Sequence, residues 1–256
     1  MTMKWIAGVA AVALSLGAHA LDLESTLKGA LRNGTASPPA TTRAASGDGV
    51  NQLKPEEVNS GIKEALTRGS EAAVAQLGKP DGFMGNTALR IPLPPNLQKA
   101  EKIMRTMGMG KQADELTLAI NRAAEAAVPE AKAMLVKSVK EMTLEDAKGI
   151  LTGGETAATD FFRRKTEAPL STRFSPIVKG VTDRVGLARH YNQYASAAAQ
   201  FGAIDKSQAT IEQYVTQQTL DRLYKVIAEQ EKALRANPLQ AASALLQTVF
   251  GAAVGR

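Results

Sequence analysis

Apolar residues recur at intervals of three and four positions through most of the chain, which is the spacing of one buried face of an α-helix. The pattern predicts helices at 55–77, 97–107, 111–128, 129–142, 143–151, 155–166, 175–185, 187–201 and 210–235. Shorter helices are expected at 21–31 and after Pro238. No segment supports a strand well. We therefore expect an all-α protein, a multi-helix bundle of about eight to ten helices.

One long irregular stretch interrupts the helical pattern. It runs from Gly78 to Asn96 (residues 78–96) and is apolar and rich in proline. Its apolar residues alternate as in a strand, but proline lacks the backbone donor that a central strand needs. A long loop of this kind either straps helices together or closes over a pocket. We favour the structural strap.

Local signals define several helix ends. Thr143 and Asp146 have the spacing of a capping box. Ser175-Pro176 looks like an N-cap followed by the first residue of a new helix, so we expect the preceding helix to end near Thr166. Inward positions are expected at Leu97, Ile103, Met104 and Met107, with Met104, Met107 and Met109 filling gaps in the core.

The N-terminus has the form of a secretory signal peptide, residues 1–20. Lys4 precedes an uncharged apolar run that is shorter than the roughly 20 residues of a membrane-spanning helix, and Ala18-His19-Ala20 is a cleavage pattern. Export to the periplasm and cleavage before Leu21 are therefore expected, with no transmembrane segment afterwards. Residues 21–49 predict a short helix and a flexible tether, and 50–256 a single helical domain.

Composition excludes several chemistries. The chain has no cysteine, so thiol catalysis, disulfides and thiolate metal sites are impossible. Removal of Lys4 leaves 30 basic and 25 acidic residues, a mature charge of +5. Because the charges are interspersed along helices, nucleic-acid binding is not expected. His190 would be the one histidine of the mature chain, and it lacks the context of a catalytic triad.

Several side chains carry oxygen atoms that could bind a metal ion, but other roles explain them more simply. Asn121 and Glu125 share a helix face, and Glu141, Glu145 and Asp146 follow further on. A calcium site is conceivable, yet helix capping and solvated helix faces account for the same residues. We therefore predict no metal, no cofactor and no catalytic residue.

The segment 143–173 is the best candidate for a binding site. Gly153-Gly154 precedes a helix start, whose free backbone donors together with arginine side chains could hold a carboxylate or phosphate. The candidate residues are Gly153, Gly154, Arg163, Arg164, Arg173, Tyr191, Asn192 and Tyr194. The alternative, which we favour, is an ion-pair network of the basic residues with Asp146, Asp160, Glu167 and Asp183.

Several runs of sequence are similar to one protein family. They are GIKEAL at 61–66, LGKPDGF at 77–83, IPLP at 91–94, NRAAEAAVP at 121–129, DAKGIL at 146–151, FFRRKT at 161–166 and YNQY at 191–194. The chain thereby resembles the bacterial domain-of-unknown-function family 4197. The resemblance implies an exported helical protein of Gram-negative bacteria, and it implies no activity.

The sequence therefore favours a non-enzymatic periplasmic binding or interaction module, whose partner is a small anionic ligand or an envelope protein. A second hypothesis is a structural or assembly protein of the envelope that uses an exposed apolar helix face. A third is a hydrolase with paired carboxylates, such as Glu125 and Asp146. The oligomeric state does not follow from the sequence.

Overall fold

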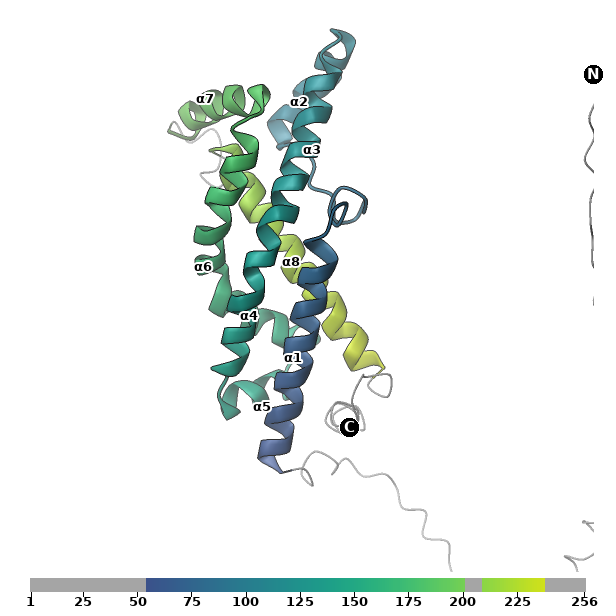
Figure 1. The fold of residues 1–256 in the computed structure, drawn as a ribbon, viewed down its shortest axis with the longest axis vertical. Helices are drawn as coiled ribbons and strands as arrows, with labels where there is room; N and C mark the ends of the chain where they lie inside the picture. The colour runs from purple at the N-terminus through teal and green to yellow at the C-terminus, as the bar shows by residue number, and fades with distance from the viewer. Residues whose placement is uncertain (1–53, 201–208, 238–256) are drawn as a thin grey trace, which may run out of the picture. The chain divides into compact units, whose positions relative to one another are not determined.

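The computed structural model describes residues 54–200 and 209–237, all within one compact unit, residues 45–256 (Figure 1). The elements are α1 (Pro55–Leu77), α2 (Pro95–Thr106), α3 (Gly110–Ala127), the 3₁₀-helix η2 (Val128–Glu130), α4 (Ala131–Lys140), α5 (Leu144–Thr152), α6 (Ala157–Thr182), α7 (Gly186–Gln200) and α8 (Ile211–Ala236). Within the described residues there is no strand, so the all-α prediction is confirmed. The predictions for residues 1–49, and for a helix after Pro238, lie outside the described residues.

The two long helices α6 and α8 pack along each other and form the centre of the bundle. Helix α3 covers α6, and α1 lies against α4, α5 and α8 (Figure 1). Phe162 and Phe174 of α6 and Tyr224 of α8 are among the largest fully buried side chains. Because aromatic side chains bury the most area per residue, this aromatic layer accounts for much of the apolar contact. None of the described helices has the length and apolar character needed to cross a bilayer.

The expected break at Ser175-Pro176 is wrong, because α6 continues through Pro169 and Pro176 as one helix. Its buried stripe repeats every four residues and passes both prolines without interruption, at Phe162, Thr166, Leu170, Phe174, Val178 and Thr182. Both prolines lie on the exposed side. The carbonyl groups that each proline leaves without a helical donor can therefore bond to water, which lowers the cost of continuing the helix.

The segment between α1 and α2 contributes buried side chains to the core although it forms no helix or strand. Phe83, Leu89, Ile91 and Leu93 insert into the core. Its non-helical part ends at Pro94, since α2 begins at Pro95, so the expected end at Asn96 is two residues too late.

Helix α3 binds the backbone of this segment through two buried side chains. The Ile91 N–H donates to Asn121 Oδ1 (2.8 Å), and Asn121 Nδ2 donates to the Ile91 carbonyl (2.9 Å). The N–H groups of Phe83 and Met84 donate to Glu125 Oε1 (3.1 and 3.2 Å). The expectation that Asn121 and Glu125 belong to a solvated face is therefore wrong, because both are buried and satisfy a loop backbone.

Helix α8 holds the other side of the segment. The Tyr214 hydroxyl donates to the Pro92 carbonyl (3.1 Å), and Arg222 Nη2 donates to the Arg90 carbonyl (3.1 Å). Burial raises the pKa of Tyr214 to about 12, so the hydroxyl keeps the proton that it donates. The segment 78–94 is thus attached to both α3 and α8.

The expected packing of α2 is partly wrong. Leu97 and Met104 pack against the edge of the core, but Ile103 and Met107 are 63% and 70% exposed, and Met109 is 41% exposed. No residue of α2 is fully buried. Met107 and Met109 therefore do not fill gaps in the core; they lie at the turn between α2 and α3.

The continuity of α6 predicts the effect of removing its second proline. Pro176→Ala restores a backbone donor inside a helix, and we expect it to raise the free energy of unfolding by about 2 kcal/mol. Pro55→Ala is the matched control, because Pro55 is the first residue of α1, where proline is favourable. Urea denaturation measures both. A loss of stability in Pro176→Ala would contradict the continuous helix.

Candidate functional site

The structure does not gather the eight predicted site residues. Gly153 and Gly154 precede the first turn of α6. Tyr191 and Asn192 lie on α7, which follows the last turn of α6. At 1.5 Å per residue, the 26 residues of α6 separate these two groups by about 38 Å. Arg163 and Arg173 are about 15 Å apart along the same axis.

Arg163 and Arg173 are both engaged with acidic side chains. Arg163 Nη1 bonds to Glu167 (3.1 Å) and to Asp221 of α8 (3.2 Å), and its guanidinium lies 4.6 Å from the centre of the Tyr224 ring. Arg173 bonds to Glu130 of η2 (2.8 Å). These contacts join α6 to α8 and η2, as an ion-pair network would.

The acidic partners only partly match the predicted network. Glu167 is a partner as expected, but Asp183 bonds to Lys179 (2.7 Å) and Asp146 caps Thr143 in the predicted capping box. Arg164 is exposed and forms no ion pair with any residue in the described part of the chain, so the expected pair with Asp160 is not formed. Asp221 and Glu130 were missed, because each is more than 40 residues away in sequence.

The first turn of α6 does bind a carboxylate, which is that of Glu231 in α8. The N–H groups of Ala158 and Thr159 donate to its two oxygens at 2.9 Å each, and the Thr159 hydroxyl adds a third bond at 2.9 Å. A helix N-terminus favours negative charge because its first N–H groups have no helical acceptor. The start of α6 therefore binds an anion as predicted, but the anion is the side chain of Glu231 and not an external ligand.

Arg235 completes this arrangement one helical turn after Glu231. It donates from Nη2 to Glu231 (2.8 Å) and to the Ile150 carbonyl at the end of α5 (2.7 Å). Both side chains are largely buried, with 17% of Arg235 and 6% of Glu231 exposed. The Glu231–Arg235 pair thus connects α8 to the end of α5 and the start of α6.

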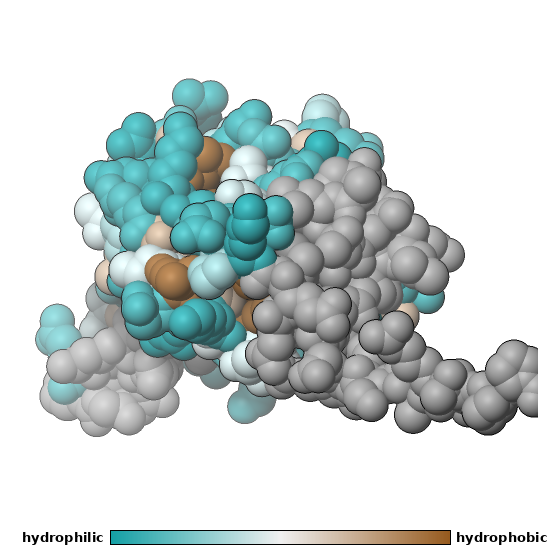
Figure 2. Space-filling view, turned by 90° about the horizontal axis from the view of Figure 1, so that it is seen from below, coloured by the Kyte–Doolittle hydropathy of each residue, from teal (hydrophilic) through white to brown (hydrophobic). Residues whose placement is uncertain are grey.

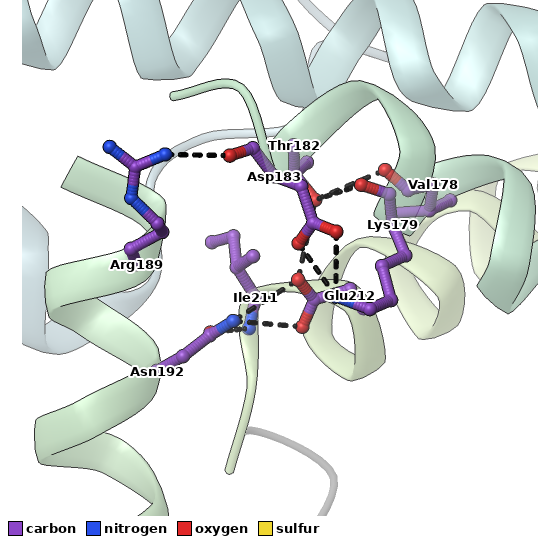
Figure 3. Close-up of polar contacts among 8 residues, drawn as sticks. All are labelled: Val178, Lys179, Thr182, Asp183, Arg189, Asn192, Ile211 and Glu212. Atoms are coloured by element: carbon purple, nitrogen blue, oxygen red, sulfur yellow. Dashed lines mark hydrogen bonds and ion pairs between the residues drawn. The ribbon is translucent and has the colours of Figure 1, made fainter. Parts of the chain in front are cut away.

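Asn192 belongs to a separate polar junction between α6, α7 and α8 (Figure 3). Asn192 Nδ2 donates to the buried carboxylate of Glu212 (3.1 Å), and Asn192 Oδ1 accepts from the Ile211 N–H (2.7 Å). Thr182 also donates to Glu212 (3.4 Å). Tyr191 is buried, and of Tyr194 only its place in α7 is described. The junction attaches α7 to the end of α6 and the start of α8.

The carboxylates proposed for hydrolysis have separate structural partners. Glu125 bonds to the backbone of Phe83 and Met84 and to Arg122 (2.6 Å), whereas the Asp146 carboxylate accepts from the N–H of Thr143, the N-cap of α5 (3.1 Å). Within residues 54–200 and 209–237 no group of three or more histidine, aspartate and glutamate side chains is placed to hold a metal ion.

A pocket of about 250 Å³ lies between α1, α5, α6 and α8. We call it the α1–α8 pocket. Its apolar walls include Leu66, Ile150, Phe162, Ile227 and Leu234. Arg68, Gln230, Glu231 and Arg235 contribute its polar atoms. Figure 2 views the molecule from the end that holds α5 and the last turns of α8, where apolar side chains appear between hydrophilic ones.

Small residues of α1 make room for this pocket. Ala65, Gly69 and Ala72 line it from one helix face, at intervals of three and four positions. A Cβ atom added at Gly69 would meet nothing within 4 Å. Sequence analysis missed the pocket because small residues on a helix equally predict closely packed helices.

The fold and the pocket define an all-helical protein whose buried carboxylates stabilise its structure and whose candidate binding surface is apolar. The chain belongs to the family described as Protein of unknown function (DUF4197), which matches residues 52–251. The resemblance seen in the sequence is therefore confirmed. Neither the curated proteins nor the solved structures contain a significant match to the chain.

The role of Glu231 predicts a large loss of stability on its neutralisation. Glu231→Gln removes the charge from the first turn of α6 and replaces one acceptor oxygen by a donor, so we expect a loss of about 2–3 kcal/mol. Glu229→Gln on the same helix changes an exposed side chain and should cost less than about 0.5 kcal/mol. Chemical denaturation compares the two. Equal stabilities would contradict the capping role.

Proposed function

We propose that this protein is an exported, periplasmic, non-enzymatic binding module. Its ligand is a small amphiphile with an apolar body and an anionic head group, held in the α1–α8 pocket. The observation that carries this proposal is the pocket itself, which has apolar walls and basic side chains among its few polar residues. Ligand sites typically combine an apolar lining with a few placed polar groups.

The pocket volume limits the ligand to a small molecule. A water molecule occupies about 30 Å³ of liquid, so 250 Å³ corresponds to the space of about eight waters. An unbranched chain of roughly eight to twelve carbons is an apolar body of suitable size. Larger ligands would have to extend into solvent.

An exposed arginine at the pocket is a partner for an anionic head group. The basic lining residues are Arg68 and Arg235, and each is paired with one carboxylate. Arg235 already bonds to Glu231, while Arg68 is half exposed and bonds to Glu64 (2.8 Å). Arg68 is thus the accessible guanidinium that a carboxylate or phosphate head would meet.

Gly69 offers a direct test. Gly69→Leu places an apolar side chain in the pocket, while leucine also suits a helix better than glycine by nearly 1 kcal/mol. Saturated fatty acids of eight, ten and twelve carbons are the probes. At a concentration one hundred times the Kd, the best of them should raise the Tm of the wild type by about 5 °C or more. Gly69→Leu should show a shift of less than about 1 °C by the same reasoning.

Gly180→Leu is the matched control for this test. Gly180 lies on the exposed side of α6 with nothing within 4 Å of an added Cβ, so the variant gains helix propensity and leaves the pocket open. It should respond to the fatty acids like the wild type. Equal responses in Gly69→Leu and Gly180→Leu would contradict a site in this pocket. A Gly69→Leu protein less stable than the wild type would show that another part of the chain already fills the pocket.

Export makes a separate prediction. Protein recovered from the periplasm should have the intact mass of residues 21–256, because cleavage after Ala18-His19-Ala20 removes the apolar segment. Intact-mass spectrometry of the periplasmic fraction measures this. Recovery of the uncleaved chain from the cytoplasm would contradict the proposed location.

A further inference from the structure

The two most exposed large apolar side chains of the described chain, Ile103 and Met107, lie at the end of α2, next to its turn into α3. Ile103, Met107 and Met109, 63%, 70% and 41% exposed, form what we call the hairpin tip. Ile103 and Met107 are one helical turn apart on the same face of α2. Met107 and Met109 flank Gly108, which has φ +76°, a conformation that glycine adopts without steric cost. In Figure 1 this turn extends past the neighbouring ends of α6 and α8.

One arginine joins α2 and α3 next to the hairpin tip. Arg105 Nη2 donates to Glu101 of α2 (2.6 Å) and to Asp114 of α3 (2.6 Å), so its guanidinium joins the two helices just behind the turn. The hydrogen bond from Arg105 lowers the pKa of Asp114. The apolar side chains therefore lie just beyond an ion-paired bridge between the two helices.

Three lysines lie close to the hairpin tip on α2 and α3. Lys99 precedes Ile103 by one turn on the same edge of α2, and Lys102 and Lys111 lie on either side of the turn. None of the three forms an ion pair with a residue in the described ranges. Glu115 is the acidic residue nearby that is likewise without such a pair. With Arg105 neutralised by Glu101 and Asp114, the hairpin retains an excess of positive charge.

From this arrangement we infer that the hairpin tip docks on the surface of a bilayer that contains anionic phospholipids. Side chains at an interface penetrate about 5–10 Å. Ile103 lies about 6 Å and Lys99 about 12 Å behind Met107 along α2. When Met107 and Ile103 enter the interface, Lys99 reaches the level of the phosphates. The apolar group and the lysines thus fit the two zones of a membrane surface.

A second copy of the chain fits this surface less well. A stable dimer buries roughly 800 Å² on each partner, and three partly exposed side chains do not present an apolar face of that size. The proposed contact is also peripheral, since no described helix is long and apolar enough to span the bilayer. It is independent of the α1–α8 pocket, so either proposal can fail alone.

Tryptophan fluorescence tests the docking directly, because Trp5 is the only tryptophan and lies in the expected signal peptide. The protein is the exported chain 21–256 carrying Met107→Trp, mixed with vesicles of phosphatidylethanolamine and phosphatidylglycerol at 3:1. We expect a blue shift of the emission of about 10 nm or more, since indole enters the interface. Leu118→Trp is the matched control, because Leu118 is 43% exposed on α3 but about 12 Å along the helix from its first residue, Gly110. It should not shift.

Co-sedimentation with the same vesicles supplies the second readout. Ile103→Ser combined with Met107→Ser should weaken binding at least tenfold, and so should 0.5 M NaCl or Lys99→Gln with Lys102→Gln. These exposed substitutions should leave the Tm within about 2 °C of the wild type. Equal binding to phosphatidylcholine vesicles, or a blue shift in both tryptophan variants, would overturn the proposal. A blue shift of Met107→Trp that rises with protein concentration in the absence of lipid would overturn it in favour of self-association.

Discussion

The packing of α6 against α8 is the contact on which the other helices depend. Leu170 and Phe174 of α6 are fully buried, and Thr166 shares a hydrogen bond with the Tyr224 hydroxyl of α8 (2.9 Å). Burial raises the pKa of Tyr224 to about 12, so the Tyr224 hydroxyl stays protonated at physiological pH and the hydrogen bond persists. Because α3 packs on α6 and α1 packs on α8, displacement of the central pair would disturb the whole core.

Buried glutamates connect the remaining elements to this pair. Glu231 receives the first N–H groups of α6, Glu212 receives Asn192 of α7, and Glu125 receives the backbone of the segment before α2. A carboxylate is costly to bury unless donors surround it, and each of these has at least two. Their oxygens are engaged in structural bonds, which argues against the use of Glu125 as a catalytic base. The same bonds explain why a bundle without disulfides can hold an irregular segment and a short helix in fixed positions.

Two surfaces remain that this packing does not use. The α1–α8 pocket is lined in part by small residues of α1, and the hairpin tip is formed by exposed apolar side chains. Exposed apolar groups gathered at one end of a molecule are typical of an interaction surface. In a module that binds a small amphiphile in the α1–α8 pocket and a bilayer at the hairpin tip, both surfaces would bind molecules with an apolar part and an anionic head group.

The sequence alone determined the helices and many of their ends, because those depend on neighbours within one or two turns. The period of the apolar residues defined α1, α3 and α8, and Thr143 caps α5 as the local sequence predicted. Only the tertiary structure decided which donors meet which carboxylates, since Glu231 and Ala158 are 73 residues apart. It also decided that Pro176 lies inside a helix and Met107 outside the core. Proline and methionine suit either place locally, and the choice depends on which face the rest of the bundle covers.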